Sequence, residues 1–309
     1  MAGVAVVTDS TASLSRGQAS SAGVTIIPLQ VVIDGVSRAE SEDAVTPAVV
    51  ARALRAGQSV TTSRPTPEAF AAAYAELAAS GCDAIVSVHL SRAMSATCEA
   101  ASKAAEMASV PVTVVNSATL AMAAGFAVLT GADAAAAGAV AEEVAERVRR
   151  RAAAATTYFY VDTLEYLRQG GRIGAAAALF GSALSVKPLL TITKGTIRPH
   201  ERVRTAAKAL VRLEDLAVSA HTKAVRTHGR AVDVAVHHLD NVAGAQGLAE
   251  RLRERLCGER GHVGHVAAPA ADREGPDECG PEVCIAEVSA VLGAHVGPGT
   301  LGIVVSPRV

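Results

Sequence analysis

Serine and threonine hydroxyls gather at the ends of several predicted strands of this chain. The clearest case is the apolar run 84–90, which is followed by Ser91, Ser95 and Thr97 and then by an alanine-rich helical pattern. A strand that feeds a helix through such a turn directs backbone N–H groups and hydroxyls at one spot, which suits an anion. The chemistry predicted here is hydrogen bonding to a negatively charged or strongly polar group.

The same pattern follows three other apolar runs, which end at 8–11, 61–63 and 116–119. In an open parallel sheet the carboxyl ends of the strands lie along one edge, and ligands bind in the crevice there. Ser and Thr are also ordinary helix caps, so each turn taken alone has a purely structural explanation. Because the pattern recurs, we expect the four turns to share one hydroxyl-lined cleft.

Short Val/Ile runs alternate with alanine-rich stretches up to about residue 116, which is typical of βαβ units and a parallel sheet. Pro65 and Pro67 mark the start of a helix with Thr66 as its N-cap, which leaves Thr62 in the preceding turn. The pattern predicts strands over 4–7, 24–33, 84–90 and 112–115, and helices over 47–56, 67–80, 95–108, 119–137 and 140–153.

A basic cluster at 149–151 gives way to alanines and then to a strand-like run, which places a domain boundary between 1–155 and 156–309. The fold class predicted is α/β with two domains, an N-terminal parallel-sheet βαβ domain and a second α/β domain with a mixed sheet. The second half predicts a hairpin over 189–198, a helix opened by Arg202 and Arg204 and reaching 222, a strand over 232–239, a helix over 243–256, a surface loop over 258–281, a strand over 285–288, a glycine-rich segment over 293–299 and a strand over 301–305.

The composition narrows the function classes. The 309 residues carry a net charge of −1, and 3% are aromatic with no Trp, so neither a basic field nor stacking platforms favour nucleic acid. Five cysteines are too few for a disulfide framework and indicate reduced thiols in a cytoplasmic protein. Asp9 interrupts the first apolar run early, whereas a signal peptide needs a continuous apolar stretch, so we expect no signal peptide. The uncharged run 117–132 predicts a buried helix and no integral membrane segment.

Two other kinds of site have weak support. Cysteines and histidines at 257, 262, 265, 279 and 284 lack the close Cys pairs of a zinc site, so we expect no metal. His237 and His238 lie at a predicted strand end, where a histidine is usually packed or solvated. A serine-type hydrolase acting on an acyl ester is the alternative function, with His295 and Asp9 as base and orienting carboxylate, although no G-x-S-x-G elbow is present.

Taken together, these residues resemble the DegV family of bacterial fatty-acid-binding proteins. The resemblance covers nearly the whole chain and rests on the order of short motifs. These motifs are Thr8-Asp9-Ser10-Thr11, Pro28-Leu29, Thr62-Ser63 with Pro65, Ser91 with Ser95 and Thr97, Gly170-Gly171-Arg172-Ile173, Lys187-Pro188, Val203-Arg204-Thr205, and Gly293-Ala294-His295 with Gly297-Pro298-Gly299.

The resemblance implies a carrier, not an enzyme, that holds one long-chain fatty acid between two domains, needs no cofactor and presents the acid to a separate fatty acid kinase for acyl phosphate formation. It implies that the carboxylate meets Thr62 and Ser95, with Ser63 and Thr97 beside them. It also implies that Arg172, Arg204 and His295 lie at the mouth or contact the kinase. Arg92 stands where the family usually has a small residue, and either pairs with the carboxylate or faces water.

The uncharged run 173–186 lies next to this cleft in the sequence. It is equally compatible with one wall of an acyl tunnel and with ordinary core. A buried acyl chain contributes about 0.8 kcal/mol per CH₂, so the polar contacts need only orient the head group.

Overall fold

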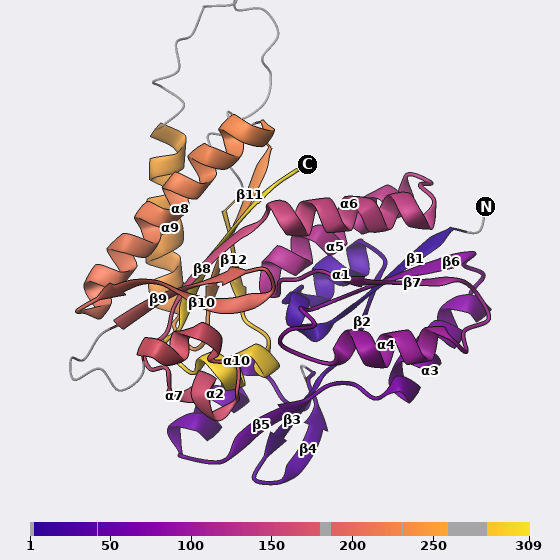
Figure 1. The fold of residues 1–309 in the computed structure, drawn as a ribbon, viewed down its shortest axis with the longest axis horizontal. Helices are drawn as coiled ribbons and strands as arrows, with labels where there is room; N and C mark the ends of the chain where they lie inside the picture. The colour runs from indigo at the N-terminus through magenta and orange to yellow at the C-terminus, as the bar shows by residue number, and fades with distance from the viewer. Residues whose placement is uncertain (1–2, 42, 180–186, 230, 259–282) are drawn as a thin grey trace, which may run out of the picture.

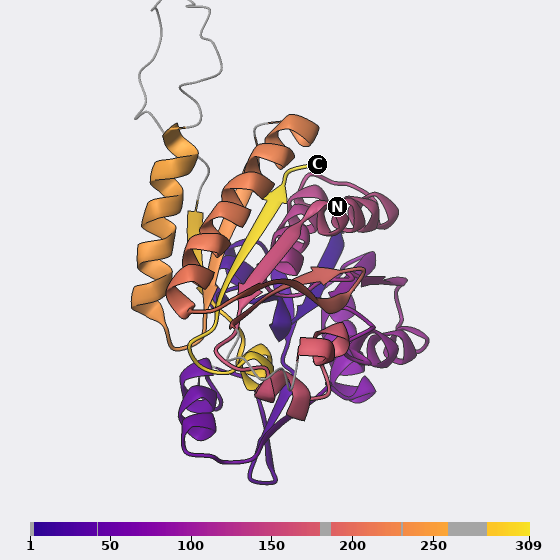
Figure 2. The same cartoon turned by 60° about the vertical axis from the view of Figure 1, so that its left-hand side comes forward.

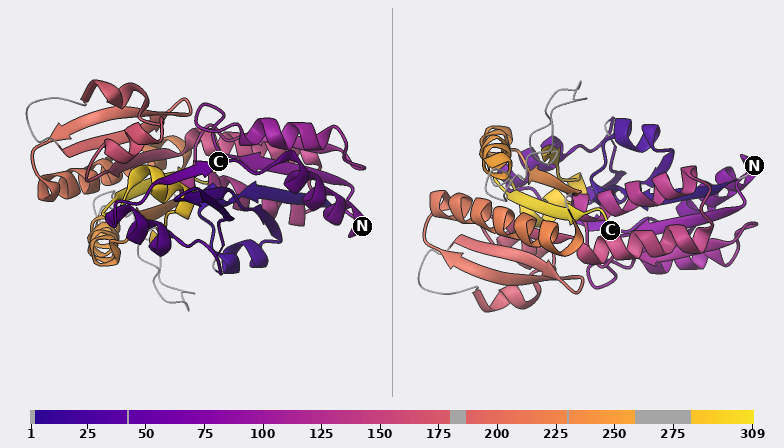
Figure 3. Two further views of the ribbon diagram at one scale, coloured as in Figure 1. Left: turned by 90° about the horizontal axis from the view of Figure 1, so that it is seen from below. Right: turned by 90° about the horizontal axis from the view of Figure 1, so that it is seen from above.

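The computed structural model of the protein describes residues 3–41, 43–179, 187–229, 231–258 and 283–309. Over these residues the chain forms a parallel sheet of four strands, a small sheet of three strands and a mixed sheet of six strands. Figure 1 shows the parallel sheet with its helices on one side of the molecule, the six-stranded sheet on the other and the small sheet below, and the two views of Figure 3 show the same elongated arrangement. The α/β class, with a parallel and then a mixed sheet, is confirmed.

The parallel sheet is buried on both faces, because successive side chains of each strand point to opposite sides. Val6, Val86 and Val88 face one side, while Val7 and Ile85 face the other. In spatial order its strands are β2 (Val24–Ile27), β1 (Val4–Asp9), β6 (Ala84–His89) and β7 (Val112–Asn116).

Helices cover both faces of this sheet. In Figure 1, α5 and α6 lie above it and α3 and α4 below it. Phe70 and Tyr74, four residues apart on α3, bury their rings against the lower face. These helices and the short α1 are α1 (Arg16–Ser21), α3 (Pro67–Ala79), α4 (Thr97–Ala105), α5 (Ala121–Ala136) and α6 (Ala141–Ala154).

The small sheet is antiparallel, and two sequence predictions fail there. The strand predicted over 24–33 divides at Pro28, which has no N–H to give to a ladder. Its second half belongs to the small sheet, and so does Thr62, which pairs with Val31 and is not in a turn. In spatial order the strands are β4 (Val36–Ala39), β3 (Gln30–Ile33) and β5 (Val60–Ser63), and α2 (Pro47–Arg55) packs nearby.

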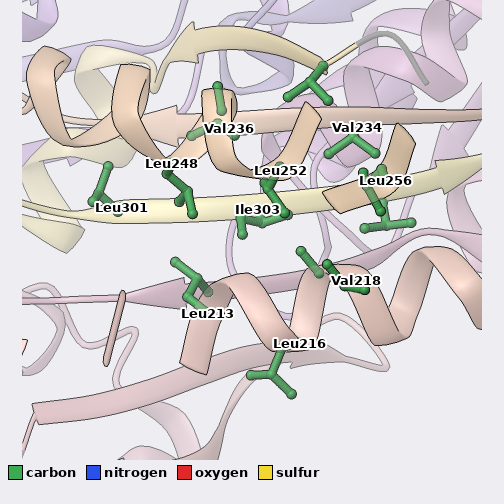
Figure 4. Packing of buried hydrophobic residues seen from close by; sticks show 14 of the residues in the cluster. Leu213, Leu216, Val218, Val234, Val236, Leu248, Leu252, Leu256, Leu301 and Ile303 are labelled. Atoms are coloured by element: carbon green, nitrogen blue, oxygen red, sulfur yellow. The ribbon is translucent and has the colours of Figure 1, made fainter. Parts of the chain in front are cut away.

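The six-stranded sheet contains only residues that follow Ala155. One face packs against the long helices α8 (Ala206–His228) and α9 (Val242–Gly258), which stand side by side in Figure 2. Figure 4 shows the interlocked leucines and valines of that layer. In spatial order the strands are β10 (Thr196–Val203), β9 (Lys187–Thr193), β8 (Thr156–Tyr160), β13 (Leu301–Pro307), β11 (Val232–His238) and β12 (Val283–Glu287).

The other face of this sheet turns toward the N-terminal half. Val304 and Ala235 pack against Met122 and Phe126 of α5. The remaining short helical segments are η1 (Ser10–Ala12), α7 (Glu165–Gln169), η2 (Gly174–Leu179) and α10 (Ala290–Val296). The strands divide at the predicted boundary, yet one core cluster joins α2 to α10 across it, so the division into domains stays a prediction.

Four further expectations need correction. Arg202 lies in β10 and Arg204 precedes α8, whose N-cap is Thr205, because the hairpin strand runs longer than predicted. The glycine-rich segment over 293–299 begins in helix α10. Cys257 is disulfide-bonded, which corrects the expectation of reduced thiols throughout, whereas Cys82 and Cys98 are free thiols. Gly258, the first residue of the loop predicted over 258–281, is instead the last residue of α9. The rest of that loop, 259–281, lies outside the described residues, as do residues 180–186 of the uncharged run 173–186.

The uncharged run 117–132 forms most of the buried helix α5, as predicted, although the helix begins at Ala121. Among the described residues, no helix has the length and apolar character needed to cross a bilayer.

Candidate functional site

An interior cavity lies where the parallel sheet, the small sheet, α10 and the six-stranded sheet meet. The cavity has a volume of about 100 Å³. Most of the wall is apolar. Phe159, Ile192 and Ile197 come from the mixed sheet, and α10 contributes Val291, Leu292 and Val296. The remaining wall includes the polar residues Thr62, Ser63, Arg64, Ser95, Arg172 and His295.

Thr62 and His295 meet at this cavity although 233 positions separate them in the sequence. Thr62 Oγ1, at the end of β5, lies 2.8 Å from His295 Nε2, near the end of α10. The imidazole fits because Gly170 has no side chain, since a Cβ there would lie 2.1 Å from His295 Nδ1. Gly170 of the Gly-Gly-Arg motif therefore holds the space for His295.

Burial, together with the nearby charge of Arg172, lowers the pKa of His295 to about 4. The ring is therefore neutral at pH 7, and one nitrogen donates while the other accepts. Nδ1 has no hydrogen-bond partner among the described residues. A proton on Nε2 makes His295 a donor to Thr62 Oγ1 and leaves the threonine proton free to point into the cavity.

Ser95 occupies the loop between β6 and α4. Its hydroxyl lies 2.9 Å from the hydroxyl of Thr97, which is fully buried at the first turn of α4 and does not line the cavity. Thr97 thus holds the Ser95 hydroxyl by a hydrogen bond, as His295 holds the Thr62 hydroxyl. Ser63 lines the cavity next to Thr62.

The arginines singled out from the sequence lie in different places. Arg172 lines the cavity, and its guanidinium donates to the carbonyls of Met94 at 3.0 Å and Gly170 at 2.6 Å. Arg204 is exposed and does not line the cavity. Arg92 also lies outside the wall, exposed and 3.6 Å from Glu99. Of the three, Arg172 alone is close enough to act on a group inside.

Two of the four hydroxyl-bearing turns do not contribute a hydroxyl to the cavity wall, which corrects the expectation of one shared cleft. The Thr8 hydroxyl donates to Val88 O at 2.9 Å, and the Ser117 hydroxyl to Thr119 O at 3.2 Å. The Ser91 hydroxyl also points elsewhere, donating to Gly195 O of the hairpin turn at 2.7 Å. These groups satisfy buried backbone, which is the ordinary role of turn hydroxyls.

The residues named for a hydrolase are not assembled around a nucleophile in the cavity. Asp9 bonds to His89 Nδ1 at 3.0 Å, and His89 Nε2 lies 2.7 Å from Ser87 Oγ, which accepts from Tyr74 at 2.8 Å. This series has the order of a catalytic triad, but its members are at most 1% exposed and do not line the cavity. It is a satisfied network inside the parallel sheet and does not favour hydrolysis.

The sequence reasoning missed Arg64 as a residue of the site, and it treated His237 only as a packed or solvated histidine at a strand end. Arg64 is exposed at the cavity wall, directly after the Thr-Ser pair, so its position in the motif was the available signal. His237 lines the cavity with both ring nitrogens occupied, since Nε2 accepts from Met122 N at 3.1 Å and Nδ1 donates to Ala286 O at 2.9 Å. Burial lowers its pKa to about 4, so it is a neutral wall residue.

No group of three or more metal-ligating side chains converges in the part of the chain that the structure describes. His262, His265 and Cys279 fall outside that part.

Comparison with known proteins decides the family. Residues 3–271 match the family model described as an uncharacterised protein of the DegV family. The chain is 48% identical over 305 residues to a DegV domain-containing protein of Streptomyces coelicolor, covering 99% of each chain. The chain belongs to the DegV family.

Two DegV family structures match the whole fold. DegV of Bacillus subtilis, described as a fatty acid binding protein, superposes with a TM-score of 0.81 at 29% identity, covering 99% of each chain. A DegV family protein of Thermus thermophilus, whose description names fatty acid binding, superposes with a TM-score of 0.77 at 29% identity, covering 99% of each chain. The resemblance seen in the sequence is confirmed.

In this DegV family protein, α10 is held at both ends by the N-terminal half. His295 bonds to β5 at one end, and at the other the Ala290 N–H donates to Glu40 Oε1. The second Glu40 oxygen is buried without a hydrogen-bond partner in the described chain. Burial raises the pKa of Glu40 to about 7, and the charge of Asp9 acts in the same direction.

In the Glu40→Gln variant, the free energy of unfolding is expected to fall less than in the wild type as the pH rises above neutrality. The folded pKa of about 7 exceeds the ordinary 4.5, so the contribution of the protonated carboxyl is complete below pH 4.5 and is lost as the pH rises through 7. Between pH 6.5 and 8.5 the wild type should lose about 1 kcal/mol more than the variant, because the contributions of His237 and His295 are the same in both proteins and cancel in the comparison. Urea unfolding across that range measures this difference, and equal slopes would contradict it.

Proposed function

We propose that the protein binds one long-chain fatty acid in the interior cavity, with the carboxylate on Thr62 and Ser95 and the tail on the face of the mixed sheet. The observation that carries this proposal is an apolar cavity whose polar part presents two hydroxyls from separate elements, each backed by a second polar group. The fatty acid binding named for the Bacillus subtilis and Thermus thermophilus relatives supports it.

The head group would be bound by donated protons. With the proton of neutral His295 on Nε2 and Thr97 as the donor to Ser95, both cavity-facing hydroxyl protons are available to the carboxylate, with Ser63 beside them. Hydrogen bonds to a charged acceptor are about twice as strong as neutral ones. Arg172 and Arg64 add positive charge at the same wall and favour an anion over a neutral head group.

The tail would supply most of the free energy. Burial contributes about 0.8 kcal/mol per CH₂, so a palmitoyl tail is worth roughly 12 kcal/mol before the costs of ordering and desolvation. Polar groups along the rest of the wall are largely bonded within the protein, as His237 is. This division of labour fits a carrier.

We further propose that the protein works in the cytoplasm as a non-enzymatic carrier and presents the carboxylate to a separate fatty acid kinase for acyl phosphate formation. Such a partner must reach the carboxylate, and Ser63 and Arg64 are exposed beside Thr62 at the wall. The buried Asp9–His89–Ser87 series offers substrates no access.

Native mass spectrometry of protein purified from a bacterial host, followed by lipid extraction, tests the binding. We expect one fatty acid per chain, and ester turnover should be absent. A chain that carries no fatty acid and takes none up when palmitic acid is added would overturn the proposal.

Arg204→Ala should separate kinase docking from ligand binding. Because Arg204 is exposed and outside the wall, its variant should keep the fatty acid and the melting temperature, while acyl phosphate formation with a fatty acid kinase falls severalfold. Arg172→Ala, unlike Arg204→Ala, should lower the melting temperature, because the Arg172 guanidinium donates hydrogen bonds to two loop carbonyls. His295→Ala should lower both affinity and phosphorylation.

Arg226→Ala is the matched control for Arg204→Ala. It removes another exposed arginine, in the last turn of α8, and should change none of these quantities. Equal kinase rates for the Arg204 and Arg226 variants would remove Arg204 from the docking surface.

A further inference from the structure

Gly302 leaves a gap in the floor of the cavity. On β13 it stands directly opposite Phe159 of β8 on one side and His237 of β11 on the other. Residues opposite each other in an antiparallel ladder share a face, so all three point the same way, and all three line the cavity. Between two rings the row carries no side chain.

The positions on either side of Gly302 show that the gap belongs to the cavity face. The side chains of Leu301 and Ile303 pack into the core beneath α8 and α9, as Figure 4 shows, and Ile303 also borders the cavity. Val304, the next residue on the cavity face, is covered by Met122 and Phe126 of α5. Along β13 the face of the sheet therefore borders the cavity at Gly302 and is covered by α5 at Val304.

The residues proposed to bind the head group are not among the neighbours of Gly302. Thr62, His295 and Arg172 are neighbours through a hydrogen bond and through the charge of Arg172 on the imidazole. Gly302 instead neighbours Phe159 and His237. A ligand whose head group lies on Thr62 would thus place a more distant part of its tail over Gly302.

We infer that Gly302 sets the length of acyl chain that the cavity accepts. This inference rests on the proposed function. A Cβ built at Gly302 would lie 3.3 Å from the Cβ of Phe159 and 3.5 Å from that of His237, so alanine fits with a small adjustment. A larger side chain has no room within the row and must extend into the cavity, where it replaces methylenes of the ligand. The backbone itself does not require glycine, because Gly302 is not among the residues with positive φ.

The experiment measures dissociation constants of lauric, myristic, palmitic and stearic acids for the whole protein and for Gly302→Ala, Gly302→Val and Gly302→Leu. We expect the affinity for the longest acids to fall in the order Ala, Val, Leu, by about fourfold for each displaced methylene, while lauric acid binds as before. The preferred chain length should shorten accordingly. Since Val and Leu suit a strand at least as well as Gly, at least one larger variant should fold.

Val304→Ile is the matched control. It adds one methylene on the same face of the same strand, but under α5, so it should lower the melting temperature without changing the order of affinities. A chain-length profile that stays unchanged in a folded Gly302→Val or Gly302→Leu protein would overturn the inference. If the wild type binds none of the four acids, the proposed function itself fails, and the two failures are distinct.

Discussion

Removing the hydroxyl of Thr62 or Ser95 is expected to weaken fatty acid binding by about ten- to a hundredfold, with a further loss when both are removed. Each hydrogen bond to a charged group is worth about 1.5 to 3 kcal/mol, and about 1.4 kcal/mol corresponds to a factor of ten in affinity. Thr62→Val keeps the shape of the side chain in β5 and removes only the oxygen that contacts His295. In the β6–α4 loop, Ser95→Ala removes only the hydroxyl that contacts Thr97.

A comparison of ligands assigns this loss to the carboxylate. Palmityl alcohol keeps the tail of palmitic acid and lacks the charge, so the wild type should prefer the acid. Each single variant should narrow that preference, whereas the tail preserves part of the affinity in the double variant. An unchanged acid-to-alcohol ratio in all three variants would be incompatible with the assignment. Arg172 and Arg64, which line the same wall, would then be the head-group partners.

Asp233→Ala is expected to destabilise the protein by about 3–5 kcal/mol, because it leaves a buried guanidinium without its counter-ion. Asp233 on β11 pairs with Arg151 on α6, and the two side chains are 9% and 6% exposed. Arg151 also donates to Ser306 at 3.2 Å and lies 5.4 Å from the centre of the Phe126 ring. The ion pair thus connects the last helix before the predicted boundary to the mixed sheet.

Arg308→Ala is the control for this ion pair. Arg308 contacts the same carboxylate at 2.7 Å, but it is 59% exposed, and exposed ion pairs contribute about 0–1 kcal/mol. Urea unfolding of both variants gives the comparison. A loss below about 1 kcal/mol for Asp233→Ala would show that water replaces the lost partner of Arg151.

Local patterns in the sequence were enough to predict the class of fold and most of the elements. Alternation of apolar runs with alanine-rich stretches predicted β1, β6 and β7 and the helices that cover them, because hydrophobic period and capping act over a few residues. The hairpin over 189–198 was predicted from an equally local pattern, whereas the Gly-Gly-Arg motif beside His295 was singled out through the family resemblance. Thr62, Ser63 and Ser95 were identified from hydroxyls at strand ends, and the structure brings all three to the cavity wall.

The partners of those hydroxyls were decided only by the tertiary structure. Whether a turn hydroxyl faces a ligand or a buried carbonyl depends on what packs over it, and this distinguishes Ser95 from Ser91, whose hydroxyl meets Gly195 of the mixed sheet. Thr62 could not be placed from its neighbours in sequence, because β5 pairs with β3 in a separate sheet and meets α10 from the far end of the chain. The gap at Gly302 exists only between its cross-strand neighbours. A glycine in a strand has no local signature of what it leaves open, since the space belongs to the residues around it.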